Sequence, residues 1–263
     1  MMSDRTAILI ALLPVVVFAF VALLEIARPR RTLRFGRLVR WRTGLVLVAS
    51  SRAALWLLAW VVAVPAVAIW ADAHSIGALN IWALPFWAEV LVSFVLLDFA
   101  MWFQHLLTHK VPVLWRLHKV HHADPDMDVS TAIRFHPGEI VFSVLWKAGW
   151  VVLFGVSAPI IITFELWLAA NAIFNHGNVE LPRGVDRFMR RFLVTPDMHL
   201  VHHSVLVPEQ QSNYGFAMTL WDRLFGTYAA ESSQSRDQQV IGLAGLQDSR
   251  ATKIGYSLKL PVT

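Results

Sequence analysis

Histidine placement is the feature that most constrains this chain. Ten of its eleven histidines lie between Asp98 and His203, and most of them fall in groups with a short repeated spacing. Residues at positions i, i+3 and i+4 of a helix share one face, so each group can direct its imidazoles at a single point. The groups are His105 and His109; His118, His121 and His122; and His199, His202 and His203, with His136 and His176 standing alone between them.

Neutral imidazole is the commonest metal ligand in proteins, and it suits iron, copper, nickel and zinc. A single tetrahedral zinc ion needs only four ligands. Nine or ten converging imidazoles therefore predict a site for two metal ions that keeps some coordination positions open. His74 lies outside the groups, and we assign it no chemical role.

The composition indicates a membrane protein. Of the 263 residues, 56% are hydrophobic and only 16% are charged, which is unusual for a soluble domain. The chain has no cysteine, and this excludes disulfides, iron–sulfur clusters and thiolate zinc sites. Its net charge of +5 does not indicate nucleic acid as a partner, because eight arginines gather between Arg28 and Arg52 with no acidic residue among them. Such a block beside an apolar run is typical of a cytoplasmic flank that contacts anionic lipid.

Three apolar runs in the first half of the chain are long enough to cross a bilayer. Residues 6–26 predict a retained helix rather than a cleaved signal peptide, because the run is long and arginines follow it. Ala53–Ala71 predicts a second span with a kink at Pro65, and a third run begins near Ile81 and continues into His109. If the arginine block is cytoplasmic, three crossings place the histidines on the cytoplasmic side as well.

Residues 139–176 hold two shorter apolar segments around a break at Gly155–Pro159. We expect a tight helical hairpin, spanning or re-entrant, with both ends on the cytoplasmic side. Lys147 and Glu165 lie nine residues on either side of Val156. An antiparallel hairpin brings them to the same depth, where an unpaired charge is costly, so we expect the two side chains to form an ion pair.

Local signals place the histidine-bearing helices outside the spans. Pro112 predicts the first turn of a helix that ends before Asp124-Pro125. Thr195-Pro196-Asp197 has the composition of a helix start, with a capping threonine followed by proline and an acid. Arg183–Leu193 mixes arginines with phenylalanines, which is compatible with a helix on an anionic interface or with a solvated helix. Beyond Thr227 the chain becomes polar, and we expect a tail that is at best partly ordered.

Together these signals predict an all-α, integral membrane helical bundle. It has about four spans, or three and a re-entrant hairpin, and a cytosolic helical cap that carries the histidine-rich site for two metals. We divide the chain into N-terminal transmembrane helices with a basic cytoplasmic loop (1–91), a catalytic domain (92–228) and a polar C-terminal tail (229–263).

Asp98 lies on the helical face that also carries His105 and His109. Imidazoles that bind a metal need an acceptor for their second nitrogen, and we assign Asp98 as such an acceptor. Carboxylate-bridged di-iron bundles use paired Glu-x-x-His motifs, and this chain has none. A histidine-rich site with open positions favours activation of O2 at iron over magnesium or calcium chemistry.

Two other functions remain compatible with the histidines. A zinc-dependent membrane hydrolase would use a metal-bound hydroxide and needs neither O2 nor a reductant. A divalent-metal transporter would bind its ion near the middle of the bilayer on broken helices. The histidines of this chain lie at helix ends and outside the spans, which disfavours the transporter.

Seven motifs together resemble one known family, the fatty acid hydroxylase superfamily, and within it the sterol desaturase branch of membrane di-iron oxygenases. Their order and spacing match across about residues 92–228. The motifs are Asp98 with His105-x-x-x-His109; Trp115-x-x-His118-x-x-His121-His122; Arg134-Phe135-His136-Pro137; Asn175-His176-Gly177-Asn178; Pro196-x-x-His199-x-x-His202-His203; Asn213-Tyr214-Gly215; and Trp221-Asp222-x-x-Phe225-Gly226-Thr227.

The resemblance implies an O2-dependent hydroxylase or desaturase that acts on a membrane lipid such as a sterol or a fatty acyl chain. It also implies two iron ions with nine ligands: His105, His109, His118, His121, His122, His176, His199, His202 and His203. His136 is either a tenth ligand or a residue that contacts the ligands without binding metal. The resemblance implies the same supporting role for Asn175, Asn178, Asn213 and Asp222. No Gly-x-Gly-x-x-Gly motif for a flavin or nicotinamide is present, so electrons come from a separate carrier similar to cytochrome b5 or ferredoxin.

Overall fold

The computed structural model describes residues 4–58, 63–82, 84–235 and 238–263. Within these ranges the chain forms helices, loops and a few isolated bridges, and no β-strand. The predicted all-α class is confirmed for the described part of the chain.

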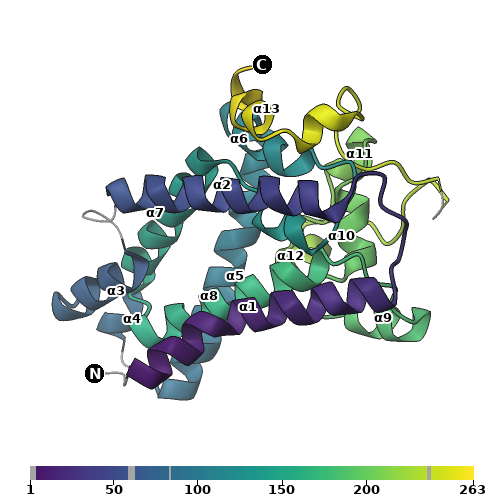
Figure 1. Cartoon of the computed structure of the whole chain (residues 1–263). Coiled ribbons are helices and arrows are strands. Elements are labelled where there is room, and N and C mark those ends of the chain that lie inside the picture. The colour runs from purple at the N-terminus through teal and green to yellow at the C-terminus, as the bar shows by residue number, and fades with distance from the viewer. Residues whose placement is uncertain (1–3, 59–62, 83, 236–237) are drawn as a thin grey trace.

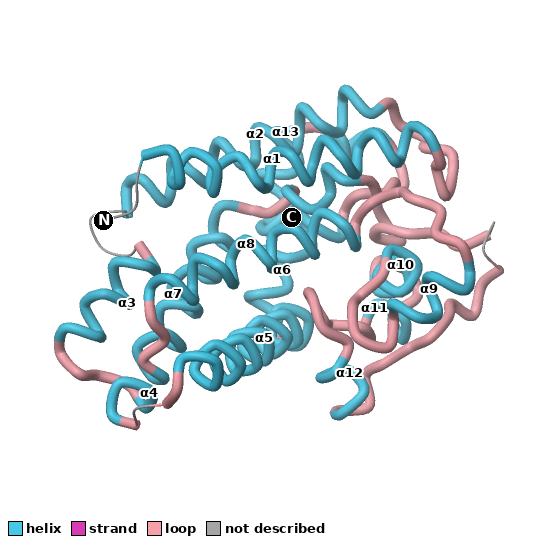
Figure 2. Tube along the Cα trace, turned by 90° about the horizontal axis from the view of Figure 1, so that it is seen from below, coloured by secondary structure: helices cyan, strands magenta, loops and turns pink. Residues whose placement is uncertain are grey.

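Three described helices are long and apolar enough to cross a bilayer: α5 (Phe86–Lys110), α7 (Pro137–Phe154) and α8 (Ala158–Asn175). Helix α1 (Asp4–Ala27) packs along α8, and α2 (Arg37–Leu58) packs along α7. In Figure 2, α7 and α8 lie between α1 and α2 on one side and α5 on the other. This arrangement agrees with a membrane helical bundle.

An apolar core joins α5, α7 and α8 to the short helix α3 (Val64–Ala73). Burying such side chains is worth roughly 1.5–3 kcal/mol each in water. Within lipid, close packing between helices takes over this role. The buried members are Val64, Ala68, Leu97, Met101, Ala148, Val151, Val156, Ile160, Ile161 and Phe164.

The two predicted apolar segments form helices on either side of the predicted break. Helix α7 ends at Gly155, whose φ of 68° lies in the left-handed region that glycine adopts without a Cβ clash. Helix α8 then starts at Ala158 with Pro159 in its first turn. The Nζ atom of Lys147 lies 2.7 Å from Oε1 of Glu165, so the expected ion pair also forms.

The pair gives a testable prediction. Lys147→Met and Glu165→Gln should each lower the free energy of unfolding, because each change leaves one charge without its partner. The double variant should lose about 0.5–1 kcal/mol less unfolding free energy than the sum of the two single losses. This coupling is small because the pair is partly exposed. Unfolding of the three variants in mixed micelles measures this coupling, and strictly additive losses would refute it.

The predicted second span, Ala53–Ala71, includes residues 59–62, which lie outside the described ranges, and its described parts belong to two helices. Helix α2 starts at Arg37, so Arg40 and Arg42 belong to its first turns and not to a loop. The chain enters the separate helix α3 at Val64, with Pro65 in the first turn. Pro65 therefore starts a helix, as its missing N–H allows, and does not kink a continuous one. The short helix α4 (Ala78–Ile81) follows before α5.

The histidine-bearing helices lie at one end of the bundle (Figure 1). Helix α6 (Pro112–His122) starts at Pro112, and α10 (Pro196–His202) has Thr195 as its N-cap, which accepts from the N–H of Met198. Both predicted helix starts are thus confirmed. The remaining elements at this end are η1 (Val129–Ile133), α9 (Arg183–Met189), α11 (Val207–Gln210) and α12 (Leu220–Leu224).

The C-terminal segment differs from the predicted tail. Its elements η2 (Ser249–Thr252), α13 (Ile254–Lys259) and η3 (Leu260–Val262) pack against α2 and α6. Leu246, Ala251 and Leu260 share one buried cluster with Leu47 and Val120. The polar run near Ser232 is followed by enough apolar residues to anchor the end of the chain, and the tail prediction overlooked them.

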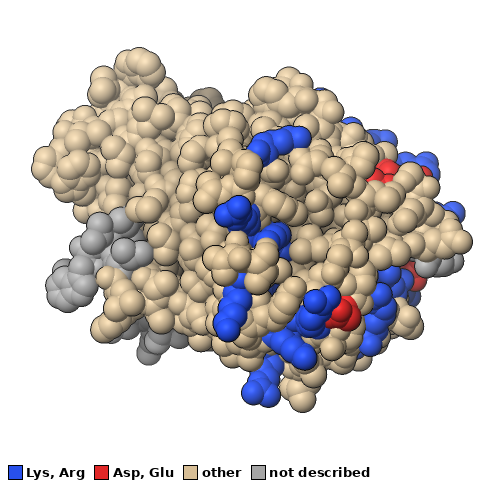
Figure 3. Space-filling view, turned by 90° about the horizontal axis from the view of Figure 1, so that it is seen from above, with Lys and Arg blue, Asp and Glu red and all other residues tan. Residues whose placement is uncertain are grey.

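Basic side chains gather on the histidine-bearing part of the molecule. Figure 3 shows Lys and Arg over α6, α13 and the neighbouring segments, whereas the part of this face toward α3 carries none. The predicted arginine block is only partly at this end: Arg40 pairs with Asp124, just after His122, whereas Arg52 lines a pocket with Val64 and Pro65 of α3.

Candidate metal centre

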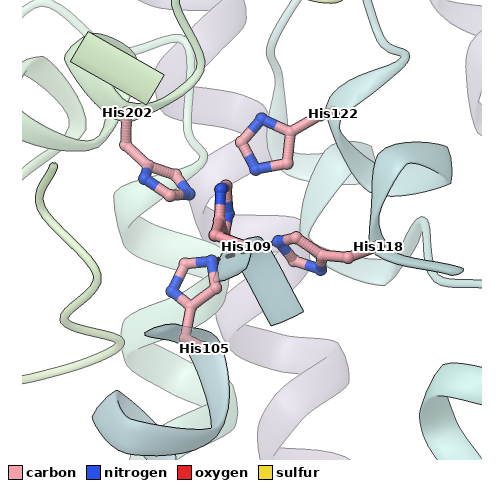
Figure 4. Close-up of side chains that lie close together, drawn as sticks. All are labelled: His105, His109, His118, His122 and His202. Carbon is pink, nitrogen blue, oxygen red and sulfur yellow. Dashed lines mark hydrogen bonds between the residues drawn. The ribbon is translucent and has the colours of Figure 1, made fainter. Parts of the chain in front are cut away.

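The structure brings the nine predicted histidine ligands together in two adjacent groups, and all nine are buried. Within each group the possible ligand atoms lie within 4.8 Å of one another. Figure 4 shows the rings of the first group turned toward a common centre. The first group is His105, His109, His118, His122 and His202, and the second is His121, His176, His199 and His203.

Histidines that neighbour each other in the sequence are divided between the two groups. His118 and His122 are one turn apart on α6 and join the first group, while His121 points to the second. On α10, His199 and His203 join the second group and His202 joins the first. The expectation that each sequence group meets at a single point is therefore wrong, because i and i+4 share a direction and the third residue is rotated from it.

The second nitrogens of four rings are fixed by acceptors. Nδ1 of His105 donates to the carbonyl of Tyr214 at 2.7 Å, and Nδ1 of His202 donates to that of Ser212 at 2.7 Å. Nδ1 of His176 donates to the carbonyl of Ala172 at 2.7 Å, and Nδ1 of His118 to Oε1 of Glu139 at 2.6 Å. Since a carbonyl oxygen only accepts, a neutral ring with this contact carries its lone pair on Nε2.

The Nε2 atoms of neighbouring rings lie close together. Nε2 of His105 lies 3.1 Å from Nε2 of His118, and Nε2 of His176 lies 3.0 Å from Nε2 of both His121 and His199. In His105 and His118 both Nε2 atoms carry lone pairs, which repel at this distance, and a cation between them would turn the repulsion into coordination. This donor geometry fits one metal ion in each group, with imidazole nitrogen as the ligand throughout.

Burial favours the neutral form of five of these imidazoles. Burial lowers the pKa of His176 to about 4. Burial, followed by the proximity of the other imidazoles, also lowers the pKa values of His121, His122, His199 and His203. A ring must be neutral at Nε2 or Nδ1 to bind a metal, so these rings are ready as ligands at neutral pH.

Glu139 is a functional candidate that the sequence reasoning missed. It lies in the first turn of α7, is buried, and holds Nδ1 of His118. A carboxylate in this position orients the ring and makes its other nitrogen a better ligand. The sequence offered one indication of this role, because Glu139 follows His136 by only three residues.

Glu139 carries a second prediction. Glu139→Ala should lower metal affinity about 10- to 100-fold, which is the usual cost of losing a partner of a ligating histidine. Glu139→Gln keeps an acceptor oxygen and should lose less. Competition with a chelator measures the affinity, and Glu89→Ala at the opposite end of α5 is the control. Equal affinity in Glu139→Ala and the control would exclude the role.

Asp98 does not hold an imidazole. Its Oδ2 accepts from the indole N–H of Trp221 at 2.9 Å, so the predicted acceptor role is wrong. Asp98 lies about two helical turns before His105 on α5. The segment that follows Tyr214 places Trp221 next to Asp98. His136 is also outside both groups: it caps α7, where its Nδ1 accepts from the N–H of Gly138 at 3.1 Å.

The other predicted polar residues hold loops around the histidines. Asn175 donates to the carbonyl of Phe216, and Asn178 exchanges hydrogen bonds with the backbone of Arg31. Asn213 has a φ of 52° and binds the backbone of Ala229 in both directions. Among the described residues, none of the three side chains is hydrogen-bonded to an imidazole of the two groups.

Asp222 acts on the site through the backbone. Its carboxylate accepts from the N–H groups of Tyr214 and Gly215, each at 2.8 Å, and from the indole of Trp102 at 3.0 Å. The carbonyl of Tyr214 in turn accepts from His105. Asp222 thus fixes the peptide that orients one ligand, although it touches no imidazole itself.

A buried ionic cluster supports the segment after His121 and His122. The guanidinium of Arg40 donates to Asp124 at 2.8 and 3.0 Å and to Asp128. Burial alone would raise the pKa of Asp124, but the charge and hydrogen bonds of Arg40 lower it below its ordinary value. Arg40 therefore ties α2 to the loop that leaves the histidine helix.

Comparison with known proteins places these residues in a family. The fatty acid hydroxylase family model matches residues 90–227. The ornithine lipid hydroxylase OlsE of Rhizobium tropici is 30% identical over 151 residues, which are 56% of this chain and 43% of that protein. Human alkylglycerol monooxygenase is 27% identical over 147 residues, 54% of this chain and 31% of that protein.

Methylsterol monooxygenase 2-2 of Arabidopsis thaliana is 26% identical over 163 residues, which are 59% of this chain and 59% of that protein. The chain therefore spans less than two thirds of the length of each of these relatives. No solved structure matches it. The family model covers more than half of the chain and includes all nine clustered histidines, so the chain belongs to the fatty acid hydroxylase family.

Proposed function

We propose that this protein is an O2-dependent oxidoreductase that hydroxylates or desaturates a membrane lipid at a histidine-bound pair of iron ions. One observation carries the proposal: two buried groups of imidazoles, in which Nε2 atoms of neighbouring rings approach to 3.0 and 3.1 Å, lie in a chain of the fatty acid hydroxylase family. The three relatives above are named as a hydroxylase or as monooxygenases, which favours this chemistry over zinc-dependent hydrolysis or metal transport.

In this proposal each histidine group holds one iron ion, the first with five rings available and the second with four. Bound iron supplies the redox chemistry by which O2 attacks an unactivated C–H bond. The protein supplies the ligands, their orientation through Glu139 and the carbonyls of Ala172, Ser212 and Tyr214, and a buried environment. Apolar rings close the site: Phe135 stacks on His121 with 4.4 Å between centroids, and Phe216 lies 4.8 Å from His105.

The substrate class and electron source follow from the same proposal. The named relatives act on an ornithine lipid, an alkylglycerol and a methylsterol, and we infer a lipid that enters from the bilayer side. Electrons come from a separate carrier, similar to cytochrome b5 or ferredoxin, because the sequence has no flavin or nicotinamide motif.

We also propose a multi-pass protein with its active site on the cytoplasmic side. The basic side chains at the histidine-bearing end support this orientation under the positive-inside rule. Residues 92–228 are the proposed catalytic region, residues 1–91 anchor it in the membrane, and residues 229–263 are packed on it.

Anaerobic purification followed by metal analysis and an oxygen-electrode assay tests the function. We expect two irons per chain and O2 consumption that requires both a reductant and a lipid. Mass spectrometry of the lipid should show the gain of one oxygen atom or the loss of two hydrogen atoms. Zinc-loaded protein that cleaves a lipid without O2 would replace this proposal with hydrolysis.

A further inference from the structure

A basic cavity lies behind the helix that carries His199 and His203. It has a volume of about 920 Å³ and is formed by α9, by residues Asp197 and Val201 of α10, by Arg223 of α12, by residues between Tyr228 and Ser235 and by Gln239. This volume is in the range of sites that bind small molecules. Six arginines line it: Arg30, Arg183, Arg187, Arg190, Arg191 and Arg223.

Three acidic residues, Asp186, Asp197 and Glu231, also line the cavity, so its positive charge is only partly compensated. Arg30 pairs with Asp197, and Arg190 pairs with Asp186. Arg183 and Arg187 are exposed and lie one turn apart on α9, and Arg191 is exposed in the turn that follows this helix. Among the described residues, no acidic side chain forms an ion pair with any of these three. Like charges at this spacing repel one another, and a bound anion would relieve the repulsion.

Large exposed apolar side chains are close in sequence to the arginines that line the cavity. Phe188 and Phe192, which alternate with the arginines along the chain, are 62% and 63% exposed. Leu224 and Phe225 beside Arg223 are 65% and 52% exposed. The ring of Phe225 stacks on Trp102 of α5 with 4.8 Å between centroids, so Phe225 is in contact with a candidate membrane span. Basic and apolar side chains in this combination are typical of elements that lie at a lipid interface.

We propose that this cavity binds the phosphate-bearing headgroup of an anionic phospholipid. The guanidinium groups of Arg183, Arg187 and Arg191 bind the phosphate oxygens, for which their planar donor geometry is suited. The acyl chains then lie along Phe188 and Phe192. An acidic protein partner fits less well, because a stable protein interface needs about 800 Å² on each side, whereas the charge here lines a small concavity.

The site is separate from the proposed metal chemistry and does not depend on it. It nevertheless borders a ligand helix, since Asp197 and Val201 belong to the helix that carries His199, His202 and His203. A phospholipid bound there holds this end of the molecule at the membrane surface.

Calorimetric titration of the full chain in a neutral detergent tests the proposal. The probes are a short-chain phosphatidylglycerol, the matching zwitterionic phosphatidylcholine and inorganic phosphate. The test variant is R183Q/R187Q/R191Q. The control R116Q/K253Q/K259Q removes the same charge from exposed side chains that do not line the cavity. All six side chains are exposed, so both variants should fold, and metal content with gel filtration verifies this.

The wild type and the control should bind phosphatidylglycerol more tightly than the other two probes. The test variant should lose about tenfold in affinity, because three exposed charge-assisted contacts of modest strength are removed. Equal affinity of the test and control variants for phosphatidylglycerol would overturn the site. Phosphate that binds as tightly as the lipid would overturn the lipid assignment. A third result would also overturn the lipid assignment: a test variant that keeps its affinity for phosphatidylglycerol but is no longer reduced by an acidic electron carrier. The cavity would then be the binding site of that carrier protein.

Discussion

Alanine in place of His122 or His203 is expected to reduce lipid oxidation by more than about 100-fold, since even the loss of a residue behind a ligand costs roughly 10- to 100-fold. The two residues test the two groups separately, because His122 belongs to the first and His203 to the second. Their rings stack with centroids 4.5 Å apart. Neither ring is hydrogen-bonded to another described residue, so its removal leaves no protein partner unsatisfied.

Iron content and turnover measure the effect. Each single variant should bind about one iron fewer per chain than the wild type, as expected when one ion loses a ligand. His74→Ala is the matched control, because His74 lies in the turn after α3 and belongs to neither group. Variants that retain both irons and full turnover would show that the imidazoles do not form the metal site.

Replacement of Arg40 by methionine is expected to destabilise the protein by about 3–5 kcal/mol, the usual cost of breaking a buried ion pair from one side. The guanidinium is fully buried and joins Asp124 and Asp128 with the carbonyl of Asp126. Without it, buried carboxylates lose the only cation that is hydrogen-bonded to them within the described part of the chain. Arg42→Met, an exposed position on the same helix, should change stability little.

Thermal unfolding in detergent measures this second effect. For a chain of this size the midpoint should fall by roughly 10 °C. Because the loop after His121 and His122 begins at Asp124, the variant should also lose metal at temperatures where Arg42→Met keeps it. Equal midpoints for the two variants would show that the cluster around Arg40 contributes little to stability.

Several features could be predicted from the sequence because they depend on local geometry. Proline and threonine fix where α6 and α10 begin, since their backbone and capping preferences act within one turn. The break at Gly155 sets the hairpin, and equal spacing from that break brings Lys147 to Glu165. The identity of the nine clustered histidines also followed from spacing and motif order.

The tertiary structure alone decided how the site is assembled. The division of the imidazoles into two groups depends on how α5, α6, α8 and α10 approach one another, and the spacing within a helix does not contain that information. The same holds for Glu139, which reaches His118 from another helix, and for Asp98, which faces Trp221 instead of a ligand. Arg40 looked like part of a basic loop but is buried among acids distant in sequence. Helix boundaries are set by neighbours along the chain, whereas partners of buried polar groups are set by long-range packing, and only the folded chain specifies those.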